Sequence, residues 1–185
     1  MQKNKKLYVA YGSNLNLRQM AMRCPNATPL GIGEIEGYEL QFKGQPHAAF
    51  ATIGPKEGAS VPVLVWELGR DDEKALDIYE GVSSGHYYKK DIPVQRYNGT
   101  ITAMVYIMNP KMTYGIPTQR YYNAVLEGYE HCELDPRRLN EAVDRSIAAY
   151  RELEQQRRVF QASRFYDDIG DMCDETFDMD EQMHF

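Results

Sequence analysis

Residues 7–15 read Leu7-Tyr8-Val9-Ala10-Tyr11-Gly12-Ser13-Asn14-Leu15, and this stretch decides how the chain begins to fold. The apolar and aromatic run 7–11 predicts a short buried strand, and Gly12-Ser13-Asn14 predicts a tight turn after it. A helix is expected next, because Asn14 or Asn16 can cap it and apolar residues then recur at helical spacing. A strand that turns into a helix start leaves backbone N–H groups pointing outward. The turn is therefore a candidate anion pocket, with an ordinary capped turn as the alternative.

The rest of the chain predicts strands first and helices last. Asp71-Asp72-Glu73 opens a short helix that Gly81 ends, and Asn98-Gly99 is typical of a two-residue hairpin turn. The expected strands cover 28–35, 38–43, 48–53, 61–68, 86–97 and 100–108, and the last helices cover 121–132 and 137 to about 159. Many strands, two short helices among them and helices at the end indicate an α+β fold.

Composition and charge indicate one domain with an acidic tail. The chain has 185 residues, of which 43% are hydrophobic, and this is enough to bury a single core. The net charge is -6, but residues 161–185 contain eight acidic side chains and one basic side chain. We therefore predict a domain over residues 1–160 and a tail over residues 161–185 that carries nearly all of the charge. Aromatic residues in the tail are compatible with partial docking.

Several classes of function are disfavoured by the sequence. A near-neutral body lacks the clustered Lys and Arg that nucleic-acid binding requires. No stretch approaches the roughly 20 apolar residues of a membrane span, and the apolar run after the basic N-terminus is too short for export. The three cysteines and four histidines are scattered without ligand spacing, so neither a disulfide framework nor a metal site is predicted. We expect a soluble, cytoplasmic protein.

A second stretch places a carboxylate where local rules disfavour one. Residues 76–88 read Leu76-Asp77-Ile78-Tyr79-Glu80-Gly81-Val82-Ser83-Ser84-Gly85-His86-Tyr87-Tyr88, and Glu80 falls at the C-terminal end of the predicted short helix. The helix dipole is negative there, and the neighbours Tyr79 and Tyr87 would exclude water, so both effects predict a raised pKa for Glu80. Such a carboxylate suits a general base near neutral pH. From position alone, an exposed glutamate without a role is the alternative.

Together, the motifs Tyr11-Gly12-Ser13-Asn14-Leu15 and Tyr79-Glu80-Gly81-Val82-Ser83-Ser84-Gly85-His86-Tyr87 resemble those of the gamma-glutamylcyclotransferase (AIG2-like) family. Shorter matching pieces occur in the expected order, among them Arg23-Cys24-Pro25-Asn26-Ala27 and Val63-Leu64-Val65-Trp66-Glu67-Leu68. The resemblance covers about residues 7–145 and leaves the tail outside. It implies a small mixed β-barrel with flanking helices, a helical C-terminal part and a pocket at one end.

The resemblance also implies an activity and a set of site residues. Members of this family convert a gamma-glutamyl group to 5-oxoproline and release an amine or amino acid, without a metal, nucleotide or organic cofactor. Glu80 would be the general acid/base. The substrate-binding residues implied by the resemblance are Tyr8, Tyr11, Gly12, Ser13, Asn14, Leu15 and Tyr121, of which Tyr121 is matched least closely because the loop before it differs in proline spacing.

Two other hypotheses remain open at the level of sequence. One is a related enzyme with a different gamma-glutamyl-amine substrate, whose specificity would come from residues 43–46, residues 113–120 or the tail. The other is a non-catalytic module that binds a small ligand or a protein through the barrel and the acidic tail. The retained Glu80 speaks against the second hypothesis. The oligomeric state is not predicted.

Overall fold

A computed structural model describes residues 5–177 of the chain, with side chains up to residue 164. The described residues divide into two compact units, one that ends at residue 147 and one that begins at residue 148. The sequence-based division at residue 160 stays a prediction. No helix among the described residues is long and apolar enough to cross a membrane.

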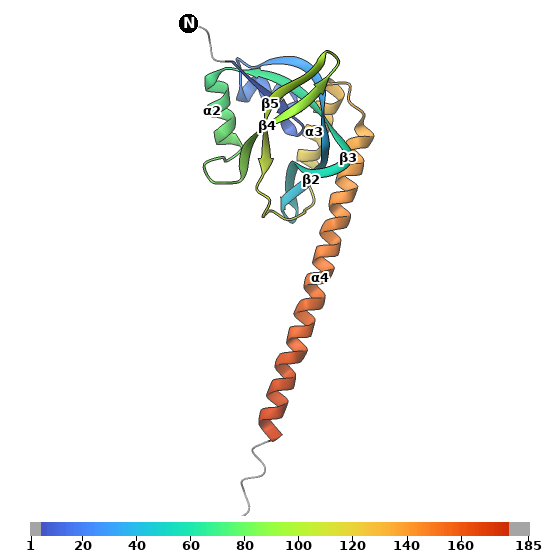
Figure 1. Ribbon diagram of the computed structural model, residues 1–185. Coiled ribbons are helices and arrows are strands. Elements are labelled where there is room, and N and C mark those ends of the chain that lie inside the picture. The colour runs from blue at the N-terminus through green and yellow to red at the C-terminus, as the bar shows by residue number, and fades with distance from the viewer. Residues whose placement is uncertain (1–4, 178–185) are drawn as a thin grey trace, which may run out of the picture. The chain divides into compact units, whose positions relative to one another are not determined.

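The first unit is built around a closed five-stranded barrel (Figure 1). The strands are β1 (Lys6–Ala10), β2 (Thr28–Gln45), β3 (Ala48–Leu68), β4 (Tyr87–Arg96) and β5 (Gly99–Met108), and they follow one another around the barrel in the order β1-β3-β2-β4-β5. All neighbours are antiparallel except β1 and β5, which pair in parallel with Tyr8 opposite Met104. The expected mixed barrel within an α+β fold is therefore confirmed.

Two long strands replace the four short strands expected between residues 28 and 68. Gly37 and residues 54–58 look like turn signals in the sequence, but β2 and β3 continue through them. The register places Glu36 opposite Ser60 and Tyr38 opposite Pro55, so residues 56–59 of β3 lie across from Gly37 alone. Gly37 has a φ of 74° there. A bulge of this kind takes up the extra residues and bends the strands without ending the ladder, which a closed barrel requires.

The helices begin close to where the capping signals predict. They are a short 3-10 helix η1 (Ser13–Leu15), α1 (Leu17–Arg23), α2 (Arg70–Tyr79), α3 (Gln119–His131) and α4 (Pro136–Phe177). The Asn16 side chain caps α1 by accepting from the backbone N–H groups of Arg18 and Gln19 at 3.1 Å each. Asp72 closes the first turn of α2 by accepting from Gly69 N at 3.0 Å. Local side-chain chemistry therefore sets where these helices begin.

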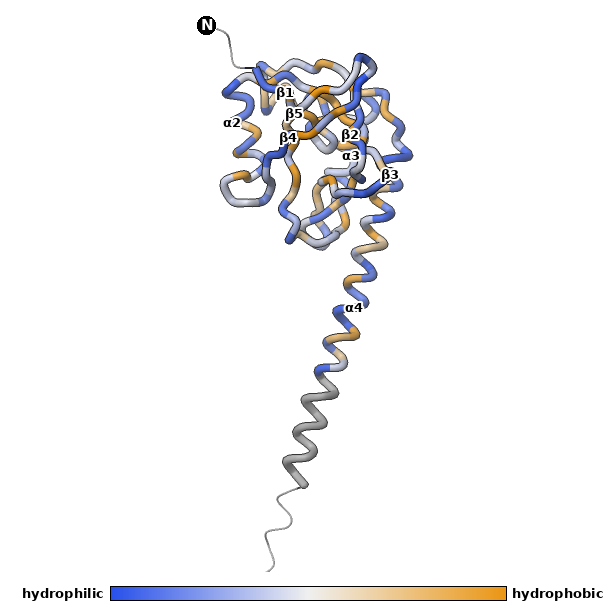
Figure 2. The backbone as a smooth tube through the Cα atoms, viewed as in Figure 1, coloured by the Kyte–Doolittle hydropathy of each residue, from blue (hydrophilic) through white to orange (hydrophobic). Residues whose placement is uncertain are grey.

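The core fills the barrel and the space beneath α3. Apolar residues concentrate on the strands (Figure 2), and Val9, Phe42, Val65 and Val105 are fully buried. Tyr129 of α3 joins the same cluster. The interior of the barrel is thus a packed core.

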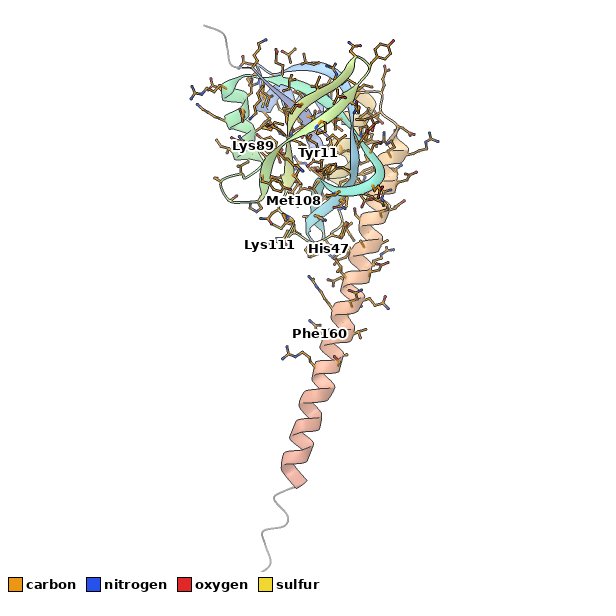
Figure 3. All side chains as sticks on the ribbon, in the orientation of Figure 1. Tyr11, His47, Lys89, Met108, Lys111 and Phe160 are labelled. Carbon is orange, nitrogen blue, oxygen red and sulfur yellow. The ribbon has the colours of Figure 1, made fainter. Side chains whose placement is uncertain are left out.

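In the second unit α4 continues to Phe177, beyond the predicted end near residue 159. No Gly or Pro occurs between Phe160 and Ile169, so nothing in the backbone stops the helix there. Val159 and Phe160 are exposed on it; Figure 3 labels Phe160. The predicted docking of the acidic tail concerns side chains outside the described residues.

Candidate active site

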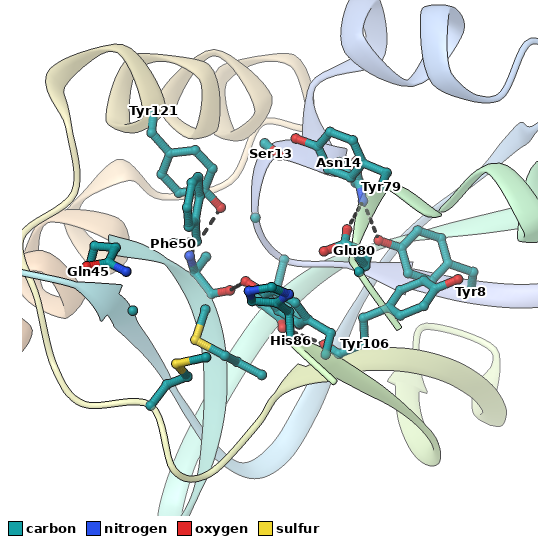
Figure 4. Close-up of a pocket in the computed structure, with 18 residues that line it drawn as sticks. Tyr8, Ser13, Asn14, Gln45, Phe50, Tyr79, Glu80, His86, Tyr106 and Tyr121 are labelled. Atoms are coloured by element: carbon teal, nitrogen blue, oxygen red, sulfur yellow. Dashed lines mark hydrogen bonds between the residues drawn. The ribbon is translucent and has the colours of Figure 1, made fainter. Parts of the chain in front are cut away.

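A cavity of about 420 Å³ opens at the end of the barrel where β1 runs into η1. Seven of the eight predicted site residues line it: Tyr8, Tyr11, Gly12, Ser13, Asn14, Glu80 and Tyr121. Figure 4 shows Asn14, Glu80 and Tyr8 meeting on one side of this cavity, with Phe50, Tyr121 and Gln45 on the other. The two motifs, about 65 residues apart in sequence, are therefore brought to one place.

Leu15 is the predicted site residue that does not line the cavity. Its side chain is fully buried in the core. Gly128 of α3 lies directly against it, since a Cβ added to Gly128 would approach the Leu15 Cβ to 2.5 Å. Leu15 therefore anchors the turn that carries Ser13 and Asn14 into the cavity wall.

Glu80 is positioned by the end of α2. It is the C-cap residue, and its backbone N–H donates to Leu76 O at 2.8 Å. Gly81 follows with a φ of 63°, a left-handed conformation that glycine adopts without strain and that turns the chain away from the helix. The helix is fastened to β4 by Lys89, whose Nζ donates to Glu73 at 2.8 Å and to Asp77 at 2.9 Å (Figure 3). The carboxylate is thus held by fixed secondary structure.

One amide connects the two motifs. Asn14 Nδ2 donates to the Tyr8 hydroxyl and to Glu80 Oε1, both at 2.9 Å. The Asn14 carbonyl oxygen accepts from Arg23 Nη1, which comes from the last turn of α1. Arg23 also donates from Nη2 to the Tyr79 hydroxyl at 2.6 Å and lies over the Tyr79 ring. Because both ends of the Asn14 amide are engaged, Asn14 has one orientation and fixes Glu80 in turn.

Burial raises the pKa of Glu80 to about 7, while the Asn14 hydrogen bond and the charge of Arg23 oppose this rise in part. The raised pKa predicted from the sequence is therefore present, and burial is its main cause. Near neutral pH a large share of the molecules has an ionised Glu80. Such a group can both accept and return a proton, which is the requirement for general acid/base work.

The tyrosines around Glu80 differ in what their hydroxyls have left to offer. Burial raises the pKa of Tyr8 and of Tyr121, so both stay protonated. The Tyr8 hydroxyl accepts from Asn14, and the Tyr121 hydroxyl accepts from Ala51 N at 3.1 Å. Each therefore still has its own proton to donate to a ligand in the cavity.

The hydroxyl groups of two further tyrosines donate their protons to backbone carbonyl oxygens of the barrel. The Tyr11 hydroxyl donates to Tyr106 O, and the Tyr87 hydroxyl donates to Ala51 O at 2.9 Å. Their rings still line the cavity and keep water from Glu80. Among the predicted site tyrosines, Tyr8 and Tyr121 are thus the candidate hydrogen-bond donors to a ligand, whereas Tyr11 contributes only its ring to the lining of the cavity.

Sequence reasoning missed several residues of this site, among them Arg23 and Phe50. Arg23 lies in one of the short segments that match the family, but no motif predicted that its side chain on α1 would contact Asn14. Phe50 alternates with buried residues in a strand, a pattern that predicts an exposed position without saying what it faces. Gly44 and Gln45, within the predicted specificity region 43–46, line the cavity, whereas none of residues 113–120 is among its lining residues.

Comparison with known proteins gives one consistent family. The AIG2-like family model matches residues 60–137. The chain is 33% identical over 111 residues to a gamma-glutamylcyclotransferase of Bos taurus and 32% identical over 110 residues to that of Homo sapiens. Each match covers 55% of this chain and 58% of the relative, so the chain spans less than two thirds of these curated relatives.

A solved structure described as a gamma-glutamyl cyclotransferase extends the likeness to the fold. It superposes with a TM-score of 0.69 at 26% identity, over 75% of this chain and 86% of the other. The resemblance predicted from the two motifs is therefore confirmed in both sequence and structure.

Proposed function

We propose that this chain cyclises a gamma-glutamyl group to 5-oxoproline and releases an amine or amino acid, as the gamma-glutamylcyclotransferases that it resembles in sequence and fold are named for doing. The observation that carries the proposal is the Glu80 carboxylate, whose pKa is raised to about 7 and which Asn14 holds in the cavity wall. Family likeness alone would support the fold; the placed carboxylate supports the chemistry.

The reaction needs a group that moves protons between two nitrogens. The α-ammonium of the glutamyl group must lose a proton before its nitrogen can attack the γ-carbonyl carbon. A new carbon–nitrogen bond then closes the five-membered ring, and the bond to the leaving nitrogen breaks. The attacking nitrogen loses two protons in all and the leaving nitrogen gains two, so atoms and charge balance. Glu80 would accept a proton from the first nitrogen and return it to the second.

Ring closure also needs the glutamyl chain folded back on itself. A cavity that holds both of its ends supplies this orientation and avoids the entropy loss of finding it in solution. The hydroxyls of Tyr8 and Tyr121, each with a proton to donate, are the proposed partners of the substrate oxygens, together with the turn at Gly12 and Ser13. These donors would also stabilise the oxyanion that forms during attack.

The direct test is detection of 5-oxoproline by mass spectrometry after incubation with a panel of gamma-glutamyl amino acids and amines. We expect 5-oxoproline and free amine in equal amounts. The matched control is the α-glutamyl isomer of each dipeptide, whose amine is joined to the other carboxyl group and should not be released. Release of glutamate would indicate hydrolysis instead, and no product from any substrate would contradict the proposal.

The pH dependence of kcat/KM follows from the state of Glu80. The base form is needed, and the pKa raised to about 7 keeps the carboxyl protonated at lower pH. We therefore expect kcat/KM to rise from pH 5.5 to pH 8 with a midpoint near 7, approaching a tenfold fall per pH unit well below it. Initial rates in buffers of constant ionic strength measure this. A flat profile across that range would contradict the role of Glu80.

Arg23 should influence the reaction through Asn14. Arg23→Gln removes a positive charge that lowers the Glu80 pKa and loosens the Asn14 carbonyl. We expect the midpoint of the pH profile to move upward and kcat/KM at pH 6.5 to fall about tenfold, the scale of one lost charge-assisted hydrogen bond. Arg18→Gln on the same helix is the matched control, because the Arg18 side chain is exposed and its guanidinium pairs with Glu127 at 3.6 Å. An unshifted midpoint would show that Arg23 only supports the fold.

A further inference from the structure

The cavity continues past Glu80 to an apolar wall that the proposed chemistry does not use. Phe50, Met108 and Met112 contribute to this wall, and Figure 4 labels Phe50 with Gln45 on the same side of the cavity. The Phe50 side chain is 47% exposed although it lies in a pocket. A large aromatic face left open in a concave site indicates a ligand group that covers it.

The wall is rigid. The Phe50 ring stands edge-on to the Tyr121 ring, with centroids 4.9 Å apart and an interplanar angle of 84°. The tip of the β2–β3 hairpin that carries Phe50 is fastened to the loop before α3, since Gly44 N donates to Thr113 O at 2.9 Å and Ala49 N donates to Ile116 O at 3.1 Å. A preformed apolar surface binds without paying for its own ordering.

The charges around the cavity also favour an apolar ligand group. Glu80 is acidic, and no Lys or Arg occurs among the described residues that line the cavity. An acidic side chain on the ligand would therefore meet a carboxylate and find no cation to pair with. An apolar side chain needs no charged partner there, and its removal from water lowers the free energy of binding.

We propose that this wall is the subsite for the leaving amine and that it selects a large apolar side chain, aromatic above all. The inference rests on the proposed function, which sets the orientation of the substrate in the cavity. With the glutamyl group held at the Gly12–Ser13 turn, the leaving nitrogen must be within reach of Glu80, and the rest of the leaving group extends to Phe50 and Met112. The substrate class is thus a gamma-glutamyl derivative of an aromatic or long aliphatic amino acid or amine.

Turnover of matched dipeptides tests the selection. We expect kcat/KM for gamma-glutamyl-phenylalanine to exceed that for gamma-glutamyl-alanine at least about tenfold, and gamma-glutamyl-glutamate to be slowest. Phe50→Ala should bring the phenylalanine-to-alanine ratio to about two or below. Tyr97→Ala, which removes a fully exposed aromatic ring on the β4–β5 hairpin, should leave the ratio unchanged. A preference for alanine or glutamate, or a ratio that Phe50→Ala does not move, would overturn the proposal.

A binding measurement separates this inference from the proposed function. N-glutaryl-phenylalanine and N-glutaryl-alanine lack the α-amino group and cannot cyclise, so calorimetry on the wild-type protein reports binding alone. Tighter binding of the phenylalanine compound, lost in Phe50→Ala, supports the subsite even if no 5-oxoproline forms. Turnover without any difference in binding or rate retains the proposed function and rejects the subsite. Equal or absent binding of the two compounds, with no turnover, rejects both.

Discussion

Glu80→Gln is expected to lower kcat by about 10³-fold, within the range for removal of a general acid/base. Glutamine has nearly the same shape, and its carbonyl oxygen can still accept from Asn14 Nδ2, as Glu80 Oε1 does at 2.9 Å. It cannot take a proton from the α-ammonium, so the attacking nitrogen stays protonated. Stopped assays for 5-oxoproline measure the loss. Glu57→Gln, a change at an exposed carboxylate on β3, should leave kcat unchanged.

The same variant should be more stable than the wild type at neutral pH. The folded-state pKa of Glu80 is raised from 4.5 to about 7, so ionisation works against folding as pH rises through this range. The penalty is fully present above pH 7 and absent below about pH 4.5. Removing the ionisable group should therefore raise the free energy of unfolding at pH 8 by up to about 3 kcal/mol, and not at pH 4. A variant that is inactive because it is misfolded would lose stability at both pH values; near-normal turnover in a folded variant would show that Glu80 is not the base.

Gly128→Ala is expected to destabilise the protein by about 2 kcal/mol and to lower activity with it. In an ordinary helix this change would be stabilising by about 1 kcal/mol, because alanine is the better helix former. Here the added Cβ would lie 2.5 Å from the Leu15 Cβ and 2.9 Å from Asn16 N. Both neighbours belong to the turn behind the site, so α3 must move away or the turn must shift, and overpacking of this kind outweighs the helix gain.

Urea denaturation of Gly128→Ala and of Glu130→Ala gives the comparison. Glu130 is an exposed position on the same helix, where the change should be neutral or slightly stabilising. Ser13 and Asn14 would move together with the turn. The kcat/KM of Gly128→Ala should therefore fall even at temperatures where the variant is fully folded. A variant at least as stable as the wild type would show that the helix can move aside freely, and that Gly128 does not set the position of the turn.

The features that sequence reasoning predicted well are those whose causes are local. Asn16 caps α1 and Asp71-Asp72-Glu73 opens α2 because each side chain acts on backbone within a few residues. The two-residue hairpin turn between β4 and β5 was predicted one residue too late: Arg96 pairs with Gly99, so the turn is Tyr97-Asn98 and not Asn98-Gly99. The place of Glu80 at the end of a short helix was predicted in the same way, whereas its role came only from the resemblance that the two motifs carry and stays a prediction. The strand breaks expected at Gly37 and at residues 54–58 were wrong, because ladder pairing with a distant strand overrides a local turn signal.

The sequence by itself determined the order of the elements, the two motifs and the family that they resemble, since spacing and capping chemistry are written along the chain. Only the tertiary structure decided that Asn14 joins Tyr8 to Glu80, that Arg23 orients Asn14, and that Phe50 faces the same cavity. These contacts depend on closing the barrel through the parallel pairing of β1 with β5, which brings residues about 95 positions apart side by side. Burial in the folded structure, which the sequence position of Glu80 does not show, is the main cause that raises its pKa to about 7.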